Sequence, residues 1–290
     1  MAWLASETTM TNAEFELLRA LMYEHSGILL KDAKRELLKG RLAKRLRHHA
    51  YESFAQYYDH LKNRDPHGAE LQEMINAVTT HKTSFFRESH HFDCLRERLL
   101  IPANRAAAQG RRAPIRIWSA GCSSGEEPYS IAITIAANLD RLNTWDVKTL
   151  GSDIDTDVLD KARAAIYPSE SVSDLPPDLV RRNFLAGNGK QAGFVQVKPA
   201  IRDLVRFGRV NLMQETWPFH GKFDAIFCRN VMIYFDRDVQ RHVLEKFARY
   251  LKPGALFFAG HSENLLGMSN FLEPIGGTVY LFGGAQGDVE

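Results

Sequence analysis

The chain has 290 residues, 44% of them hydrophobic, and a formal net charge of +2. A composition of this kind fills one large core or two modest ones, which excludes a disordered or fibrous protein. The three cysteines form no C-x-x-C pair, no H-E-x-x-H occurs, and neither a basic-then-apolar leader nor an apolar run of bilayer length is present, so we expect a cytoplasmic protein with no disulfide framework, no metal site and no membrane insertion.

Residues 1–80 are predicted to form an N-terminal helical domain without strands. Thr11 with Glu14, and Ser53 with Gln56, each fit the capping box that starts a helix. Apolar residues recur at helical spacing after each of these pairs. The pattern predicts four short helices in this domain.

The second of these helices, from Asp32 to about His49, is strongly basic. It is either a solvated helix face or a landing surface for an acidic partner. A nucleic acid is not the expected partner, because no aromatic residues are interleaved with the charges and the remainder of the chain is near neutral. The candidate partner-binding residues are Lys34, Arg35, Lys39, Arg41, Lys44 and Arg45, with Lys31 and Arg47 beside them.

A junction opens the second predicted domain, 81–290. Phe85 and Phe86 in this junction are expected in the core, whereas Thr83 and Arg87 beside them are candidate polar site residues. A new helix is predicted to follow.

A strand, a glycine loop and a helix come next. Ile115–Ala120 is predicted to be a buried strand, Gly121 and Gly125 bracket a tight turn, and an apolar helix continues to Leu139. In a doubly wound sheet such a loop leaves the carboxyl end of a strand, where a nucleotide-like ligand lies against exposed backbone N–H groups.

Glu126 and Glu127, at the start of that helix, discriminate among such ligands. Two carboxylates at this place would repel a pyrophosphate, which disfavours a dinucleotide. A ligand with hydroxyls and positive charge is favoured instead, and S-adenosylmethionine has a ribose, an amino group and a cationic sulfonium.

The segment Gly121–Gly125 also fits the G-x-S-x-G nucleophile elbow of α/β-hydrolases. That interpretation requires several preceding strands, whereas the preceding residues are predicted to be helical. His261 is available as a downstream base, so a hydrolase stays open as the weaker alternative. The other interpretation of His261 is a structural histidine whose hydrogen bonds are satisfied.

A second strand, Val147–Gly151, ends in an acidic segment. Asp153 stands where an acid accepts hydrogen bonds from ribose hydroxyls. Asp155 is expected to cap the next helix, predicted over 158–166. Residues 167–205 are predicted to be an inserted β subdomain of short antiparallel strands, whose free edge either accepts a peptide as an extra strand or has no binding role.

The α/β pattern then resumes. We expect strands at 205–210, 223–228, 255–259 and 277–282, and a helix at 239–251 that ends at Lys252–Gly254. Residues 260–264 are expected to form a loop over the site.

Methyl transfer from a sulfonium is an in-line displacement, so the protein chiefly desolvates and aligns the nucleophile and the methyl group. A carboxylate nucleophile needs no base, only a donor that holds it, and Arg87 or Tyr234 can serve. Asn230 is followed by Val-Met-Ile and not by the Pro-Pro expected for amine or amide targets. This argues against methylation of DNA adenine or of glutamine.

Five motifs follow one another along the chain: Thr-x-Phe-Phe-Arg-Glu from Thr83, Ser-x-Gly-Glu-Glu-Pro-Tyr-Ser from Ser123, Ser-Asp-Ile-Asp from Ser152, Phe-Cys-Arg-Asn-Val-Met-Ile-Tyr-Phe from Phe227 and Ala-Gly-His-Ser-Glu from Ala259. Together they resemble the chemotaxis receptor glutamate methyltransferases, the CheR family. The resemblance implies a class I S-adenosylmethionine-dependent methyltransferase fold: an α/β protein with a doubly wound, mostly parallel seven-stranded sheet, an N-terminal all-α domain and an inserted small antiparallel β subdomain. It implies S-adenosyl-L-methionine as donor, S-adenosyl-L-homocysteine as product, and methyl esterification of receptor glutamates in adaptation.

The resemblance places Arg87 and Tyr234 nearest the reacting centre, and it leaves open whether Glu126 or Glu127 meets the cofactor. The basic helix would meet the acidic methylation region of the receptor's cytoplasmic domain, and we expect a monomer. His81 stands where the family has asparagine, so this contact is expected to be altered or pH-sensitive. The predicted cofactor-binding residues are His81, Thr83, Arg87, Gly121, Glu127, Asp153, Asn211, Leu212, Cys228, Arg229 and Asn230.

The β subdomain bears on a second contact with the receptor. Gly187, Gly189 and Gly193 match the G-x-G-x-x-x-G of family members that dock on a receptor's C-terminal pentapeptide, which favours such tethering. The arginines that flank this motif in those members are replaced by Ala186 and Gln196, which argues against it.

Two other functions stay open. The first is a receptor-binding module that has kept the fold and lost turnover, against which Arg87, Asp153 and Tyr234 argue because all three are present. The second is a small-molecule carboxyl methyltransferase, for which the basic N-terminal helix would have no use.

Overall fold

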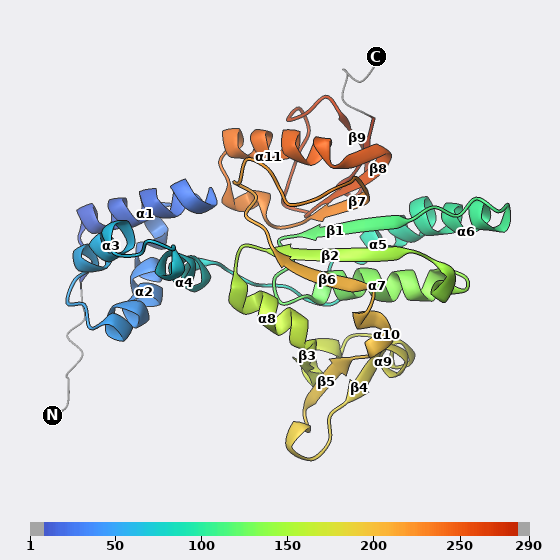
Figure 1. Ribbon diagram of the computed structural model, residues 1–290, viewed down its shortest axis with the longest axis horizontal. Coiled ribbons are helices and arrows are strands. Elements are labelled where there is room, and N and C mark those ends of the chain that lie inside the picture. The colour runs from blue at the N-terminus through green and yellow to red at the C-terminus, as the bar shows by residue number, and fades with distance from the viewer. Residues whose placement is uncertain (1–8, 284–290) are drawn as a thin grey trace.

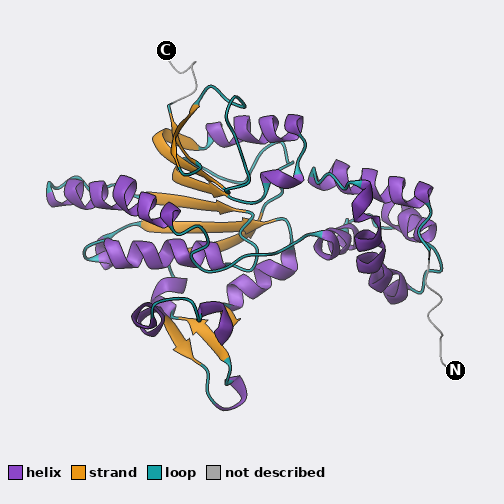
Figure 2. Cartoon of the chain, turned by 180° about the vertical axis from the view of Figure 1, so that it is seen from behind, coloured by secondary structure: helices purple, strands orange, loops and turns teal. Residues whose placement is uncertain are grey.

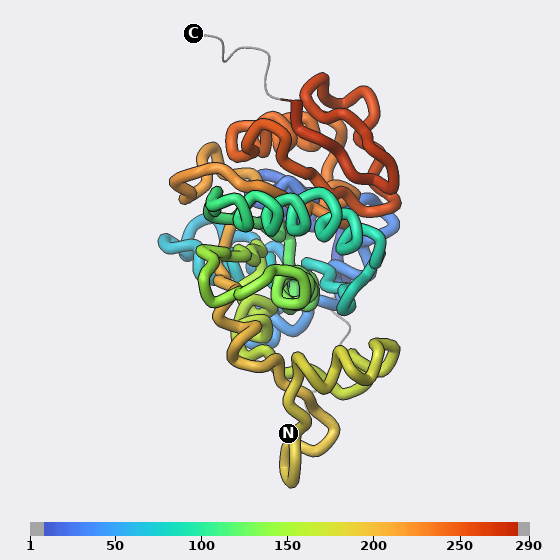
Figure 3. The backbone as a smooth tube through the Cα atoms, turned by 90° about the vertical axis from the view of Figure 1, so that its right-hand side faces the viewer, coloured from blue at the N-terminus to red at the C-terminus, as the bar shows by residue number. Residues whose placement is uncertain are grey.

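The computed structural model describes residues 9–283. A group of N-terminal helices lies beside the carboxyl ends of the strands of a large sheet, and a small second sheet projects from the side of the large sheet that is away from α11 (Arg237–Arg249) and β9 (Leu272–Gly276) (Figures 1 and 3). A loop joins the N-terminal helices to the α/β part (Figure 2). None of the helices in the described part of the chain is long and apolar enough to cross a membrane, and no group of three or more His, Cys, Asp or Glu side chains there is arranged to hold a metal ion.

The N-terminal part contains four α-helices, as predicted. They are α1 (Asn12–Ser26), α2 (Arg35–His49, preceded by a 3-10 turn), α3 (Phe54–Asn63) and α4 (Ala69–Val78). Their apolar faces meet in one core, which includes Phe15, Leu42 and Tyr57. This packing buries the helical stripes that the sequence periodicity predicted.

The two predicted helix starts differ in detail. At Thr11 the capping box is complete, because its hydroxyl accepts the N–H of Glu14 and the Glu14 carboxylate accepts the N–H of Thr11. At Ser53 only half of it forms: the hydroxyl accepts the N–H of Gln56, but the Gln56 side chain accepts the N–H of Glu52. The prediction of a second full capping box was therefore wrong.

The large sheet has seven strands in the order β6-β2-β1-β7-β8-β10-β9. The first five run parallel, and β10 pairs antiparallel with both β8 and β9. This confirms the predicted doubly wound, mostly parallel seven-stranded sheet. The strands are β1 (Ile115–Ala120), β2 (Val147–Asp153), β6 (Val205–Arg209), β7 (Phe223–Cys228), β8 (Leu251–Ala259), β9 (Leu272–Gly276) and β10 (Val279–Phe282).

Helices cover both faces of this sheet. Alternate residues of β1 divide the core, since Ile117 packs in one cluster and Trp118 in the other. The Ile117 face is covered by α7 (Glu126–Asn138) and by a continuous helical run made of α5 (His90–Leu95), a π-helical stretch (Arg96–Leu100) and α6 (Ile101–Ala108); α11 (Arg237–Arg249) covers the Trp118 face.

Two helix ends and one strand differ most from the prediction. The helix α8 (Thr156–Ala164) ends before Ile166, which starts a strand of the small sheet. The helix α11 ends at Arg249, and Lys252–Gly254 lies in an irregular start of β8 where the register with β7 shifts. The strand β9 was not predicted. It contains Pro274, which has no backbone N–H, and it lies at the edge of the sheet, where proline is tolerated.

The small sheet is antiparallel, as predicted, with the order β3-β5-β4. One face packs on α7, where Phe184 and Val195 meet Tyr129. The other face exposes large apolar side chains, Leu185 and Phe194 among them. Its elements are β3 (Ile166–Pro168), α9 (Pro177–Asn183), β4 (Phe184–Ala186), β5 (Phe194–Val197) and α10 (Pro199–Arg202).

Candidate cofactor and methyl-transfer site

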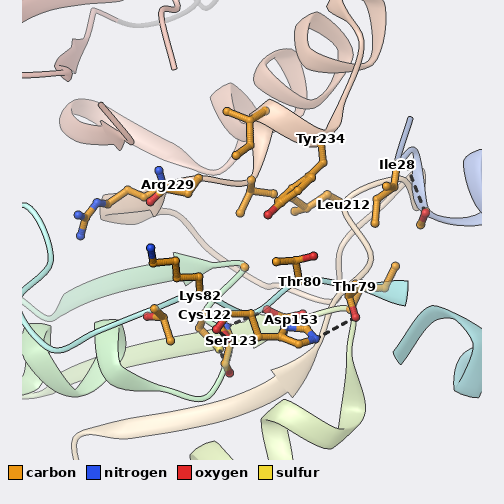
Figure 4. Close-up of a pocket in the computed structure, with 18 of the residues that line it drawn as sticks. Ile28, Thr79, Thr80, Lys82, Cys122, Ser123, Asp153, Leu212, Arg229 and Tyr234 are labelled. Carbon is orange, nitrogen blue, oxygen red and sulfur yellow. Dashed lines mark hydrogen bonds between the residues drawn. The ribbon is translucent and has the colours of Figure 1, made fainter. Parts of the chain in front are cut away.

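A cavity of about 390 Å³ lies where the carboxyl ends of β1, β2, β6 and β7 meet the N-terminal helices. Asp153 and Ser123 line it from one side and Tyr234 and Leu212 from the other (Figure 4). The sheet order changes direction at β1, so the cavity opens at the switch point where doubly wound folds bind ligands.

The glycine loop after β1 borders this cavity at Gly121, where no side chain covers the backbone. Gly121 has a φ of +77°, and a Cβ there would overlap the Val231 side chain. The N–H groups of Gly121 and Cys122 both donate to the Ser152 carbonyl, at 2.8 Å each. Glycine is therefore required at 121 both by the backbone conformation and by the close approach.

Asp153, at the end of β2, is the acid that the sequence predicted for a ribose. Its side chain is buried and borders the cavity, and it accepts the N–H of Ser123 at 2.8 Å and the N–H of Asp155 at 3.0 Å. Burial raises the pKa of Asp153, and these backbone hydrogen bonds oppose the rise. The carboxylate is thus held in a fixed orientation with acceptor capacity left for hydroxyl donors.

Asp155 caps α8, as predicted, by accepting the N–H groups of Asp157 and Val158. It also binds the Thr79 hydroxyl at 2.7 Å and lies 2.8 Å from Nε2 of His81. Burial raises the pKa of Asp155, but these hydrogen bonds outweigh it and hold that pKa below its usual value. His81 lines the cavity with its ring tied to this wall.

Glu127, and not Glu126, borders the cavity. It accepts the Ser119 hydroxyl at 2.6 Å and lies 3.1 Å from Nη1 of Arg229, whereas Glu126 bonds to Ser124 away from the cavity. Burial raises the pKa of Glu127, and the Arg229 guanidinium opposes the rise. Of the two carboxylates at the helix start, Glu127 is therefore the one that faces the cavity.

Arg229 borders the cavity but acts first as a buried clamp. Its guanidinium lies between Glu127 and Glu88, 3.0 Å from the latter, and donates to the carbonyl of Arg87. Its predicted neighbour Asn230 lines the cavity, but Cys228 does not: that side chain is fully buried in the sheet core.

The predicted reacting pair also reaches the cavity. The ring of Tyr234 projects into it (Figure 4), and burial raises the pKa of its hydroxyl. Arg87 donates from Nη1 to the Lys82 carbonyl at 3.0 Å, and Thr83 lines the cavity nearby. Phe85, as expected, is buried in the core.

Asn211 and Leu212 follow β6 and line the cavity. The Asn211 amide donates to the carbonyl of His25 at 2.6 Å and its oxygen accepts the N–H of Met213 at 2.9 Å. This joins the end of α1 to the wall of the cavity.

Sequence reasoning missed that wall. Ser26, Ile28, Leu29, Leu30 and Leu37 also line the cavity, and the N–H of Leu29 donates to the carbonyl of Tyr234 at 2.9 Å. The one sequence signal was Gly27, which was interpreted only as a helix stop. A Cβ at Gly27 would overlap the Met213 side chain, so the glycine also permits this docking.

The hydrolase alternative is wrong. No strand precedes β1 within residues 9–283, and the N–H of Ser123 is bound to Asp153. His261 is exposed, stacks on His90 with 5.0 Å between ring centroids, and is not among the residues that line the cavity.

The basic helix α2 presents fewer free charges than the sequence suggested. Arg45 forms ion pairs with Glu70 and Glu73 inside the helical domain, so its charge is already paired within the chain. Burial raises the pKa of Glu70, but hydrogen bonds from Arg45, His49 and Tyr57 lower it to about 2.

The other charges of α2 divide into two groups. Arg41 donates to the carbonyls of Val78 and Thr79, Arg35 hydrogen-bonds Asn12, and Lys39 pairs with Glu36 at 3.4 Å. The exposed cations of α2 and of the turn before it are Lys31, Lys34, Lys44 and Arg47, and Lys34 also lines the cavity.

The three glycines of the β subdomain shape one loop between β4 and β5. A Cβ at Gly187 would overlap the Gln191 carbonyl, and Gly189 and Gly193 have φ values of +54° and +87°. The loop thus needs glycine for its own conformation. A groove beside β4 is lined by Val172, Leu175, Val180, Phe184, Ala186 and Val195 among others.

A bare glycine loop, an acid at the end of the second strand and a cavity at the switch point together define a class I S-adenosylmethionine-dependent methyltransferase. The features fit that cofactor, since Gly121 borders the cavity without a side chain and the Asp153 carboxylate, held by two backbone N–H groups, has acceptor capacity left for hydroxyl donors.

Family comparisons agree. A family model described as CheR methyltransferase, SAM binding domain, matches residues 81–281, and one described as CheR methyltransferase, all-alpha domain, matches residues 13–79. The chain belongs to the CheR methyltransferase family, and S-adenosyl-L-methionine is its cofactor.

Curated relatives match over nearly the whole chain. The protein is 46% identical over 272 residues to chemotaxis protein methyltransferase 2 of Pseudomonas aeruginosa, covering 93% of each chain. It is 43% identical over 280 residues to the chemotaxis protein methyltransferase of Klebsiella aerogenes, covering 97% of this chain and 93% of the relative. For the Escherichia coli protein of the same description the identity is 41% over 278 residues, with 96% and 93% covered.

Proposed function

We propose that this enzyme transfers the methyl group of S-adenosylmethionine to glutamate side chains of chemotaxis receptors and forms methyl esters. The observation that carries the proposal is the set of charged and polar side chains that line the cavity. Its acids, Asp153 and Glu127, are engaged by backbone or side-chain donors, while Tyr234 and Arg87 supply donors at its mouth. This arrangement suits a nucleophile that is already ionised, as a glutamate carboxylate is at neutral pH.

The residues divide the work in the proposed reaction. Asp153 accepts the ribose hydroxyls, and Glu127 attracts the amino group. Leu212 and Ile233 exclude water from the reacting centre. Tyr234 and Arg87 hold the substrate carboxylate in line with the methyl group.

The bonding changes are simple. The cofactor supplies an electrophilic methyl group on a sulfonium centre. A carboxylate oxygen bonds to the methyl carbon as the carbon–sulfur bond breaks, leaving a neutral ester and a thioether. No proton is transferred, so the cavity needs no free general base.

The experiment for this proposal is methylation of receptor with labelled S-adenosylmethionine. Label that enters the receptor and is released as methanol by mild alkali identifies a carboxyl methyl ester. Binding of the cofactor without transfer would leave the receptor-binding module as the function, and transfer to a small carboxylic acid but not to receptor would identify a small-molecule enzyme.

The exposed cations of α2 are proposed to contact the acidic methylation region of the receptor. Like the cavity mouth, they lie on the N-terminal side of the molecule, and Lys34 belongs to both. The double variant Lys44→Glu, Arg47→Glu is expected to raise KM for receptor about 10-fold at low salt, because two attractive contacts become repulsive.

The matched control is Arg105→Glu, on exposed α6 at the far end of the molecule (Figure 1). It should leave KM unchanged, and the effect of the double variant should shrink at high salt. Equal KM values for both variants would rule out docking through α2.

A second receptor contact is proposed at the β subdomain. The strand β4 is an edge of the small sheet, and the groove beside it is apolar, so an extended receptor C-terminal pentapeptide can add a strand there. Gly187, Gly189 and Gly193 support the neighbouring loop. Ala186 and Gln196 contribute no charge to the contact, which limits its strength.

Calorimetric titration with a synthetic receptor C-terminal pentapeptide is expected to give binding to the wild type and none to Gly187→Val, because a side chain at 187 displaces the loop at Gln191. Gly40→Ala is the control, since a Cβ there has open space. No binding to the wild type, together with normal receptor methylation by Gly187→Val, would remove tethering.

A cytoplasmic location and a monomeric state complete the proposal. The cytoplasm follows from the proposed substrate, because the methylated region belongs to the receptor's cytoplasmic domain. Sedimentation at micromolar concentration tests the monomer.

A further inference from the structure

The motif Ala259–Glu263 follows β8, and its acid lies behind the wall of the cavity. Glu263 is 4% exposed. Its Oε2 accepts the N–H groups of Gly260 at 2.6 Å and Asn230 at 2.8 Å, and its Oε1 accepts the N–H of Ile233 at 3.3 Å. One carboxylate therefore satisfies backbone donors from two separate loops.

The turn that Glu263 binds carries residues into the cavity. Asn230 has a φ of +60°, and a 3-10 turn, Met232–Tyr234, follows it. Asn230, Ile233 and Tyr234 line the cavity, whereas Glu263 itself does not. A left-handed residue followed by a short turn leaves backbone N–H groups without ladder partners, and these are the groups that the carboxylate accepts.

The fit between the two loops is close. A Cβ at Gly260 would lie 2.5 Å from Nδ2 of Asn230 and 2.9 Å from Oε2 of Glu263. Burial raises the pKa of Glu263, while the hydrogen bonds from Gly260 and Asn230 oppose the rise. Charge-assisted bonds of this kind are roughly twice as strong as neutral ones, so they hold the turn in one conformation.

We infer that Glu263 is a positioning residue for methyl transfer: its carboxylate fixes the turn that carries Asn230 to the cofactor and Tyr234 to the substrate carboxylate. It touches neither ligand and acts through the backbone of that turn. The inference rests on the proposed function for its substrate half, whereas its cofactor half is independent of the receptor.

The experiment compares full-length wild type with Glu263→Gln, which keeps the shape but replaces one acceptor oxygen with an NH₂ group that faces an N–H donor. Losing a charged acceptor of buried N–H groups is expected to lower kcat for receptor methylation about 10- to 100-fold and to weaken S-adenosylhomocysteine binding about 10-fold. KM for receptor should stay within about twofold, because the docking surface is untouched.

The matched control is Asp224→Asn, at the start of β7, the strand whose other end leads into the turn that Glu263 binds. Asp224 accepts the N–H of Arg116 at 2.8 Å and pairs with Lys252, far from the cavity. It is expected to change the melting temperature without changing kcat or product affinity. Glu263→Asp is the second variant if the glutamine variant does not fold; it keeps the charge but is one methylene shorter, and should show a smaller loss of the same kind.

A double-mutant cycle with Tyr234→Phe separates positioning from general stability. If Glu263 acts through Tyr234, the double variant loses less kcat than the product of the two single losses. Unchanged kcat and product affinity in folded Glu263→Gln, or strictly multiplicative losses, would overturn the inference. If wild type binds the product but methylates no receptor, the proposed function fails, and the product affinities of the Glu263 variants still decide the cofactor half.

Discussion

Replacing Asp153 with alanine is expected to abolish measurable binding of S-adenosylmethionine and of S-adenosylhomocysteine. A charged hydrogen bond contributes about 1.5–3 kcal/mol, so the loss of two ribose contacts weakens binding about 100-fold or more. The variant also frees the buried N–H groups of Ser123 and Asp155, which now hold the loop. Titration calorimetry with both ligands measures the effect.

Two further variants test whether the loss of binding is specific to the Asp153 carboxylate. Asp160→Ala, on the exposed side of α8 where Asp160 pairs with Arg163, should bind both ligands as the wild type does. Asp153→Asn keeps the side-chain shape and should bind more weakly than wild type. Tight binding to Asp153→Ala would show that the cofactor lies elsewhere in the cavity.

Replacing Tyr234 with phenylalanine is expected to lower kcat for receptor methylation about 100-fold, because the hydroxyl is assigned to align the substrate carboxylate with the methyl group. The affinity for S-adenosylhomocysteine should change little, because the hydroxyl is assigned to the substrate carboxylate. Single-turnover methylation and product titration measure the two effects separately.

Tyr250→Phe is the matched control, since that hydroxyl bonds to the backbone of Trp217 at 3.2 Å in the core and does not reach the cavity. It should leave kcat unchanged. A wild-type kcat in Tyr234→Phe would assign the carboxylate to Arg87 alone, and a lost product affinity would place the hydroxyl on the cofactor.

Local features of the fold were predictable because neighbouring residues encode them. The hydroxyl of Thr11 and the carboxylate of Glu14 cap a helix from three positions apart, and Asp155 caps α8 in the same way. Where a local sequence pattern was compatible with two secondary structures, tertiary packing determined which one formed. The Lys252–Gly254 segment has the composition of a helix end, but Leu251 and Leu256 on either side of it pair with β7, so it lies in an irregular part of strand β8.

The candidate site was predicted on its sheet side and missed on its helical side. Gly121 and Asp153 follow strands of a parallel sheet, so their meeting is a consequence of topology. The wall formed by the segment after α1 belongs to the N-terminal helical part, and no rule of sheet topology predicts that it lies beside the carboxyl ends of the strands. Its contact with Asn211 joins positions that are 186 residues apart.

By itself the sequence determined the class of the protein. The glycine loop, the acid after the second strand and the carboxylates at the helix start select a nucleotide-like, positively charged cofactor, because each acts through its own charge or backbone. The five motifs then determined the family.

Only the tertiary structure decided which charges are unpaired and which acids face the cavity. Arg45 forms an ion pair with Glu70, whereas Lys44 is exposed to solvent, although both lie on the same basic helix. Glu127 faces the cavity and Glu126 does not, and Glu263 organises a turn far from it in sequence. The reason is that the burial and the ion pairing of a side chain depend on residues distant along the chain. A charged side chain is available to a ligand only if it is not already paired with such a residue.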